Sequence, residues 1–365
     1  MSFKDISQVD DNFKSTFSKN GITLYDVNEP PFALFGLYRE ENERDFKRLP
    51  KRVAEATDNN SVRTLYTNTA GIRLRFKTDS KRIILKCKLP SVGGGTNMPL
   101  TGSSSFDMYA DGRYTTVFRP GVSIDDLDDS TPDYVGGYTS GYTFAAGGVM
   151  RDILISFPLY NDVDEVYIGL DDTARLLPAD EYTYKLPVYF YGSSITQGGC
   201  ASHPGASYQA IISRRLDTDF CNLGFSGGCR AEEVLGEHFA SLPMSIFVLD
   251  YDHNAPDIDY LRATHYTFYE LLRKKRPELP IVMISAADQF LKGYKERREV
   301  IRDSYNRAVQ NGDKNVYFID GGEIYRDFGV DYCVVDTVHP NDLGFLCMAN
   351  AIEPVIKAIL DKQSK

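Results

Sequence analysis

Ser194 is the residue of this chain best suited to act as a nucleophile. It stands in the Gly/Ser-rich segment 191–199, directly after the apolar run 187–190, which predicts a buried strand. A serine hydroxyl is a weak nucleophile at neutral pH and needs a neighbouring base. His339 is the candidate base, and Asp336, three positions earlier, is suited to hold the imidazole in the required tautomer. These residue types predict acyl transfer by a Ser-His-Asp triad.

Acyl transfer also needs hydrogen-bond donors for the oxyanion that forms in the transition state. Two further blocks, 222–227 and 250–254, lie between the serine and the histidine and supply such groups. The candidate donors are the backbone N–H groups of Ser194 and Gly227 and the side-chain amide of Asn254. Taken alone, Gly227 would be a turn glycine, and Asn254 would be a helix cap or an Asx-turn. The order and spacing of the four blocks favour the catalytic interpretation.

A parallel sheet is the scaffold that the second half of the chain predicts. After residue 186, helix-like segments alternate with apolar runs at 246–249, 281–284 and 316–319. This rhythm is typical of strands that helices cover on both faces. One helix is expected from about Asp257 to Lys274, with His265 as a satisfied core histidine on its apolar face. Open sheets of this kind place their chemistry at the carboxyl ends of the strands, where Ser194 lies.

The first half of the chain has a different pattern. Alternating polar and apolar residues predict half-buried strands at 72–76, 82–87, 105–109, 114–118, 151–157 and 165–170. The Asp111-Gly112 pair between two of them signals a hairpin. We therefore expect an N-terminal β-sandwich of jelly-roll type over residues 1–185 and an α/β domain over 186–365. The Gly-, Tyr- and Asp-rich stretch 121–150 predicts a surface loop, with a lid, a sugar-facing loop or a partner-chain contact as alternatives.

The composition fits a globular protein of 365 residues with 42% hydrophobic residues, which is long enough for two cores. A net charge of −10 argues against nucleic acid or an anionic membrane as the main partner. The polar first residues show no apolar segment of a signal peptide, and we expect no window near the ~20 apolar residues of a membrane span. The expected location is the cytoplasm. Whether the protein forms a homo-oligomer is left open by the sequence.

No metal and no cofactor are expected. The six cysteines form no CxxC pair and are interpreted as reduced, buried small residues. The five histidines lack the spacing of a zinc site, and no phosphate-binding glycine motif is present. His203 and His253 lie near the motifs and are candidate substrate-binding residues, with turn capping as the alternative for His253.

The motifs of the second half resemble the SGNH (GDSL-type) hydrolase family. The resemblance lies in the motif Tyr-Gly-Ser-Ser-Ile-Thr-Gln-Gly-Gly-Cys-Ala-Ser at 191–202 and in the glycine, asparagine and histidine blocks that follow it in order. It covers about residues 187–365, and segment 106–109 is similar to the N-terminal β-domain of one subgroup. The resemblance implies a flavodoxin-like three-layer α/β/α fold and ester hydrolysis without a metal. Members with this architecture are often deacetylases of carbohydrates.

This sequence departs from the family pattern at several places, two of which lie in the motifs themselves. Ser193 replaces the usual acidic residue before the nucleophile, a variant that the subgroup shares. Asp252-His253-Asn254-Ala255 stands where the family usually shows Gly-x-Asn-Asp. The asparagine is kept, so the second departure affects the shape of the pocket rather than the reaction.

We therefore expect a carboxylic ester hydrolase, an SGNH-type acetylesterase that acts through an acyl-enzyme. The expected partner is a small-molecule or oligosaccharide ester that carries a small acyl group, with acetyl first. A short-chain lipase or thioesterase stays open, although the mean hydropathy of −0.32 disfavours an interfacial lipase. A carbohydrate-binding protein with a degenerate hydrolase domain is the alternative from another class.

Overall fold

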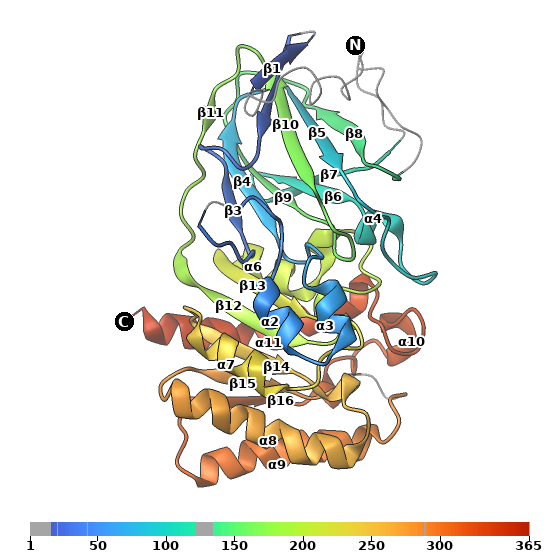
Figure 1. Ribbon diagram of the computed structural model, residues 1–365, viewed down its shortest axis with the longest axis vertical. Coiled ribbons are helices and arrows are strands. Elements are labelled where there is room, and N and C mark those ends of the chain that lie inside the picture. Colours follow the sequence, from blue (N-terminus) through green and yellow to red (C-terminus); the bar gives the residue numbers. More distant parts are fainter. Residues whose placement is uncertain (1–15, 20, 42, 121–133, 288–289, 365) are drawn as a thin grey trace.

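The computed structural model describes residues 16–19, 21–41, 43–120, 134–287 and 290–364 of the chain. Two lobes follow one another along its long axis (Figure 1). The first lobe holds two antiparallel sheets, and the second holds a parallel sheet with helices on both sides. The expected combination of a β-sandwich with an α/β domain is confirmed.

The sandwich contains the six strands that alternation predicted. Its first sheet has the order β1-β2-β10-β5-β8, with the bounds Thr16–Lys19, Ile22–Asp26, Glu165–Asp171, Arg82–Lys88 and Tyr138–Thr143. Its second sheet has the order β11-β4-β9-β6-β7, with β3 paired to β4. The bounds there are Leu176–Leu177, Arg73–Thr78, Arg151–Ser156, Phe106–Ala110 and Arg113–Phe118, with Ala33–Phe35 for β3. Apolar side chains from both sheets meet in one core, among them Leu85, Ile168, Met108 and Ile155.

Two details of the first lobe test the sequence interpretation. Asp111 and Gly112 have positive φ angles of 51° and 73° and join β6 to β7, so the predicted hairpin is confirmed. The stretch 121–150 is not one surface loop, because strand β8 within it pairs with β5. Tyr138 of this strand is 3% exposed and donates its hydroxyl to the backbone oxygen of Phe118 at 2.9 Å, so it fills the core. Residues 121–133 lie outside the described part of the chain.

The second lobe is built on a five-stranded parallel sheet in the order β13-β12-β14-β15-β16. The bounds in that order are Thr218–Gly224, Tyr184–Gly192, Ile246–Asp250, Ile281–Ile284 and Val316–Ile319. Strand β12 comes first along the chain and lies between β13 and β14. In open parallel sheets, ligands generally bind at the carboxyl edge of the sheet, at the position where the strand order reverses. Strand β12, which leads to Ser194, holds this place.

Helices cover both faces of the parallel sheet, so the expected three-layer α/β/α arrangement is confirmed. Val188 and Phe190 of β12 pack into the core with α6 (Tyr208–Leu216) and α11 (Asp342–Gln363). The alternate residues Tyr189 and Tyr191 pack into the opposite core, toward α7, α8 and α9. These three helices have the bounds Glu233–Ser241, Ile258–Lys275 and Tyr294–Gln310.

Two short helices of the first half, α2 (Lys51–Ala56) and α3 (Asn60–Leu65), pack on the second lobe. Val53 and Val62 belong to the core that α7 and α8 cover. Strand β12 begins at Tyr184, close to the predicted boundary at residue 185, and that boundary stays a prediction. The remaining short helices are α4 (Leu100–Ser103), α5 (Ser194–Gln197), η2 (Pro204–Ala206), η3 (Asp252–Asn254), η4 (Gly321–Glu323) and α10 (Val330–Cys333).

The last helix, α11, corrects the expectation that no segment approaches a membrane span. An 18-residue window of this helix has a mean hydropathy of 1.6, so its length and composition would suffice for one. Half of that window is buried, and Phe345, Ile352 and Ile356 are part of the core against the sheet. The position of the helix in the core accounts for its apolar composition.

His265 lies fully buried on α8, but it is not the satisfied histidine that we expected. Among the described residues, neither of its ring nitrogens has a hydrogen-bond partner. Its ring stacks on Tyr251 with the centroids 6.0 Å apart. Burial lowers the pKa of His265 to about 4, so the ring is neutral at pH 7. It packs in the core as an uncharged aromatic ring.

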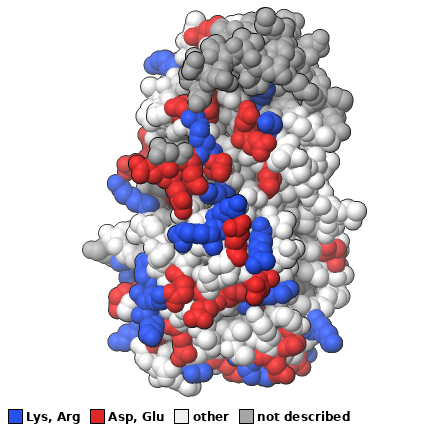
Figure 2. Space-filling model, in the orientation of Figure 1, with Lys and Arg blue, Asp and Glu red and all other residues white. Residues whose placement is uncertain are grey.

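Charged side chains of both signs are interspersed on the face that Figure 2 shows. Many charged groups of this chain pair with one another, as Arg44 does with Asp26 at 2.9 Å. Among the described residues of this face, no continuous basic surface forms that would attract a polyanion.

Candidate active site

A chain of hydrogen bonds joins Ser194, His339 and Asp336. Ser194 Oγ lies 2.8 Å from His339 Nε2, and His339 Nδ1 lies 2.8 Å from Asp336 Oδ2. With Nδ1–H donating to the carboxylate, Nε2 keeps the lone pair that can accept the serine proton. The structure brings together three residues that sequence reasoning named at separate positions.

The Asp336 carboxylate accepts four hydrogen bonds. Oδ1 accepts from the backbone N–H groups of Val338 at 3.2 Å and His339 at 2.8 Å. Oδ2 accepts from the His339 ring and from Asn97 Nδ2 at 2.5 Å. Partial burial alone would raise the pKa of Asp336, but these donors lower it to about 2. The carboxylate is therefore ionised at neutral pH and can stabilise a positive imidazole.

Ser194 sits on a tight turn between β12 and α5. Ser193 caps α5 by accepting the Ile195 N–H at 3.2 Å, and Ser194 is the first helical residue. The Ser194 N–H therefore has no acceptor inside the helix and is open to a ligand. Gly224 of the neighbouring strand approaches this turn so closely that a Cβ there would lie 2.1 Å from Gln197 N. Only glycine fits at this contact.

The two other motif blocks follow β13 and β14 and are tied to the same turn. The Ser226 N–H donates to Gln197 Oε1 at 2.9 Å. The next residue, Gly227, has a φ angle of 69°, and no acceptor among the described residues takes its N–H. Asn254 Oδ1 accepts the Cys229 N–H at 3.1 Å, which leaves the Nδ2 end of the amide for a ligand. The three candidate oxyanion donors thus lie on loops that hydrogen bonds connect.

Two residues of the first lobe reach this site, and sequence reasoning named neither of them. Asn97 donates to Asp336, as described above, and the hydroxyl of Tyr160 donates to the backbone oxygen of Ser194 at 3.0 Å. No sequence signal singles them out, because both lie far from the motifs along the chain. Their positions show that the first lobe forms part of the site.

Arg48 holds the backbone of the block 222–227 in place. Its guanidinium donates to the backbone oxygens of Gly224 at 2.6 Å, Asn222 at 3.2 Å, Asn68 at 2.7 Å and Leu65 at 2.5 Å. Full burial lowers the pKa of Arg48 to about 9, so the group stays charged at neutral pH. This residue of the first half therefore fixes the backbone that leads into the Gly227 turn.

The two candidate substrate-binding histidines lie in different surroundings. His203 Nδ1 is 2.6 Å from Asp107 Oδ2, and its ring stacks on Tyr114 with the centroids 4.6 Å apart. It joins the two lobes, and 18% of its side chain is exposed. His253 Nδ1 is 3.2 Å from Asp252 Oδ1, and only 6% of its side chain is exposed. Substrate binding stays a prediction for both, and His253 offers the smaller surface.

Two groups of potential metal ligands lie here among the described residues. They are Cys200, Asp336 and His339, and Asp250, Asp252 and His253. Burial and the nearby Asp336 raise the pKa of Cys200 to about 12, so its thiol stays protonated. All six cysteines are free thiols, and five of them are buried as expected, whereas Cys221 is half-buried. The metal-free site stays a prediction.

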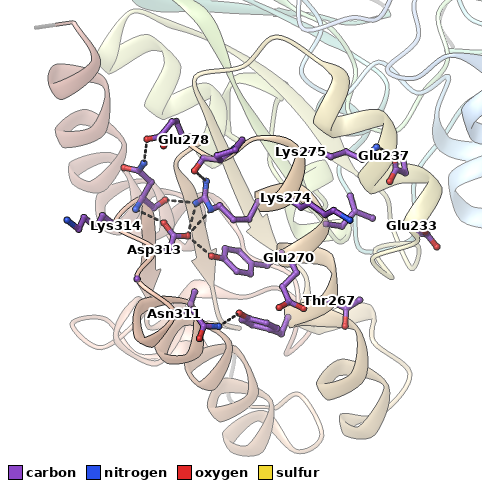
Figure 3. Close-up of a pocket in the computed structure, with 18 residues that line it drawn as sticks. Glu233, Glu237, Thr267, Glu270, Lys274, Lys275, Glu278, Asn311, Asp313 and Lys314 are labelled. Carbon is purple, nitrogen blue, oxygen red and sulfur yellow. Dashed lines mark hydrogen bonds and ion pairs between the residues drawn. The ribbon is translucent and has the colours of Figure 1, made fainter.

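A separate groove of about 1050 Å³ lies between α7, α8 and segment 311–315 (Figure 3). Charged and polar side chains line much of it, and some pair with one another, as Arg273 does with Asp313 at 2.9 Å. None of the candidate catalytic residues lines this groove.

Two family models together match most of the chain. Residues 185–357 match the GDSL-like lipase/acylhydrolase family, and residues 22–176 match the N-terminus of the SGNH-hydrolase type of esterase. No curated protein matches the chain. The resemblance that the motifs indicated is confirmed in both halves.

Solved structures share the two-lobe architecture. A protein of Bacteroides ovatus described as a GDSL-like lipase is 28% identical, with a TM-score of 0.81 over 93% of this chain and 98% of its own. A salicylyl-acyltransferase from a tetracycline biosynthetic pathway is 19% identical, with a TM-score of 0.73 over 94% and 98%. An acetyl xylan esterase of the rumen bacterium Butyrivibrio proteoclasticus is 13% identical, with a TM-score of 0.57 over 94% and 99%. At these low identities, the similarity to the last two structures shows a shared fold alone.

Proposed function

Since the chain is an SGNH (GDSL-type) hydrolase, and thus a carboxylic ester hydrolase, we propose that it is a serine esterase that removes acetyl groups from carbohydrates. The hydrogen-bonded series of Ser194, His339 and Asp336 at the carboxyl edge of the parallel sheet carries this proposal. Nucleophile, base and orienting carboxylate are in contact, as acyl transfer by a serine requires.

In the first half-reaction, Ser194 Oγ attacks the carbonyl carbon of the ester while His339 Nε2 takes the hydroxyl proton. The ionised Asp336 stabilises the imidazolium that results. The N–H groups of Ser194 and Gly227 and the amide of Asn254 stabilise the negative charge on the former carbonyl oxygen. The bond to the alcohol oxygen then breaks, and that oxygen takes the proton from His339 as the alcohol leaves.

Water completes the cycle. It attacks the carbonyl carbon of the acyl-enzyme and gives a proton to His339 Nε2, and the second tetrahedral intermediate then releases Ser194 Oγ. The serine oxygen regains the proton from the imidazolium. The products are the carboxylic acid and the free alcohol, and the proposed cycle uses no metal or cofactor.

Two observations support a small acyl group on a sugar. Ser194 is only 8% exposed, so little of its surface is open to a substrate. An acetyl xylan esterase also shares the fold over nearly the full length of both chains. As part of the same proposal, the enzyme acts in the cytoplasm on a soluble ester.

Initial rates on p-nitrophenyl acetate, butyrate and octanoate, and acetate release from an acetylated oligosaccharide, test the proposal. The wild type should prefer acetate, and Ser194→Ala should lose kcat by at least about 10⁴-fold while its melting temperature changes little. The matched control is Ser364→Ala, which removes an exposed serine hydroxyl at the end of α11 and should behave as the wild type.

Other outcomes would assign a different function. A preference for octanoate would indicate a lipase or thioesterase with the same mechanism. Tight binding of the oligosaccharide without release of acetate would indicate a carbohydrate-binding protein. Activity retained by Ser194→Ala would remove Ser194 from the role of nucleophile.

A further inference from the structure

We propose that Asn97, which the first lobe carries, is a positioning residue for the histidine–aspartate pair of the second lobe. Its Nδ2 donates to Asp336 Oδ2 at 2.5 Å, and the same oxygen accepts from His339 Nδ1 at 2.8 Å. This role rests on the proposed esterase mechanism and adds a residue to it. Asn97 fixes the carboxylate so that Oδ2 stays directed at the imidazole.

The loop that carries Asn97 is anchored to the sandwich at both ends. It connects the end of β5 with α4 and reaches toward α10 at the border between the lobes (Figure 1). Ser104 Oγ donates to the Gly93 oxygen at 3.2 Å, and the Tyr160 N–H donates to the Ser103 oxygen at 3.1 Å. Gly93 passes so close to Tyr160 that a Cβ there would lie 1.7 Å from its backbone oxygen. The sandwich therefore determines where Asn97 meets the second lobe.

The two oxygens of Asp336 are held in different ways. Oδ1 accepts backbone N–H groups of its own turn, from Val338 and His339. Among the described residues, the donors to Oδ2 are two side chains, namely Asn97 and the imidazole. The Asp336 side chain is 32% exposed, so without Asn97 water would compete for Oδ2. Asn97 excludes that water and also draws part of the negative charge away from the imidazole.

Loss of the Asn97 amide has consequences that a purely structural role would not produce. A less fixed carboxylate orients the imidazole less well, so kcat falls. KM changes little, because Asn97 acts through Asp336 and not on the substrate.

Rates on p-nitrophenyl acetate, measured with the full chain, test this role. Asn97→Ala should lower kcat about 3- to 30-fold and change KM by less than about twofold. Asn97→Asp keeps the shape of the side chain but replaces the donor by a like charge beside Asp336, so the loss of kcat should be larger. Thr96→Ala, at the exposed neighbouring position, is the matched control and should behave as the wild type.

A double-mutant cycle shows whether Asn97 acts through Asp336. In an Asp336→Asn background, Asn97→Ala should change kcat by less than about twofold. An undiminished effect in that background, or an Asn97→Ala variant with wild-type kcat, would overturn the role. If Asn97→Ala lowers the melting temperature strongly, Asn97→Ser replaces it in the same cycle.

The esterase proposal and the role of Asn97 fail in distinguishable ways. A Ser194→Ala variant that keeps its activity would overturn the whole mechanism. An inactive Ser194→Ala variant together with a fully active Asn97→Ala variant would leave the mechanism in place and remove Asn97 alone.

Discussion

The hydroxyl of Tyr160 in the first lobe donates to the backbone oxygen of Ser194, 3.0 Å away. The same oxygen accepts the N–H groups of Gly198 at 3.1 Å and Gly199 at 2.9 Å, so three donors converge on the backbone oxygen of Ser194. Burial raises the pKa of Tyr160 above its ordinary value, so its hydroxyl stays protonated and remains a donor. Both lobes therefore build the turn on which Ser194 sits.

Tyr160→Phe should lower the free energy of unfolding by about 1 kcal/mol and reduce kcat only modestly. One buried hydrogen bond is lost, while the two backbone donors of the turn remain. Urea unfolding and rates on p-nitrophenyl acetate measure both effects. Tyr305→Phe, on α9, is the control. A loss of activity as large as that of Ser194→Ala would show that Tyr160 does more than support the turn.

His339→Ala should abolish turnover, because the imidazole contacts the serine hydroxyl directly. Asp336→Asn should lower kcat less, by about 10²- to 10⁴-fold, because the carboxylate acts through the imidazole. Values of kcat/KM for both variants, beside Asp331→Asn as an exposed control on α10, measure the difference. An Asp336→Asn loss equal to or greater than that of His339→Ala would contradict a purely orienting role.

Asn254→Asp separates the donor role of this amide from its structural role. The aspartate keeps an oxygen that accepts the Cys229 N–H, but it replaces the Nδ2 donor with a negative oxygen. We expect kcat to fall by at least about 10²-fold with little change in melting temperature. Asn254→Ala loses both functions and should also be less stable. A fully active Asp variant would remove Asn254 from the proposed oxyanion site.

Asp250 gives the free energy of unfolding a pH dependence. It is 2% exposed at the end of β14 and accepts from Thr196 Oγ1 at 3.1 Å. Burial, with a further contribution from Asp252, raises its pKa to about 6. The unfolded chain has an aspartate pKa of about 3.9, so the folded state holds this proton more tightly. The free energy of unfolding therefore falls as the pH rises from about 4 to 6 and stays lower above that range.

Asp250→Asn should remove this pH dependence. The melting temperature of the variant relative to the wild type should be higher at about pH 8 than at about pH 4, because only the wild type must ionise the buried carboxyl group. Thermal unfolding of both proteins at a series of pH values measures the difference. The same difference at both ends of the series would contradict the raised pKa.

The motifs were readable from the sequence because each depends on local pattern. Ser194 follows an apolar run, and an apolar run before a Gly/Ser turn marks the carboxyl end of a buried strand. Six of the strands of the sandwich were predicted in the same way, through alternation with a period of two. Tyr138 was misjudged because glycine and aspartate around it suggested a loop, whereas cross-strand packing places it in the core.

By itself, the sequence determined the two-lobe fold class and named the candidate nucleophile, base and oxyanion donors. Periodicity and strand-end motifs are properties of neighbouring residues, so no folded structure was needed to see them. Only the tertiary structure decided that Asn97 and Tyr160 reach the site and that His265 lies buried without a hydrogen-bond partner among the described residues. Asn97 and Asp336 are 239 positions apart, and a contact across that distance depends on how the two lobes pack, which no local pattern records.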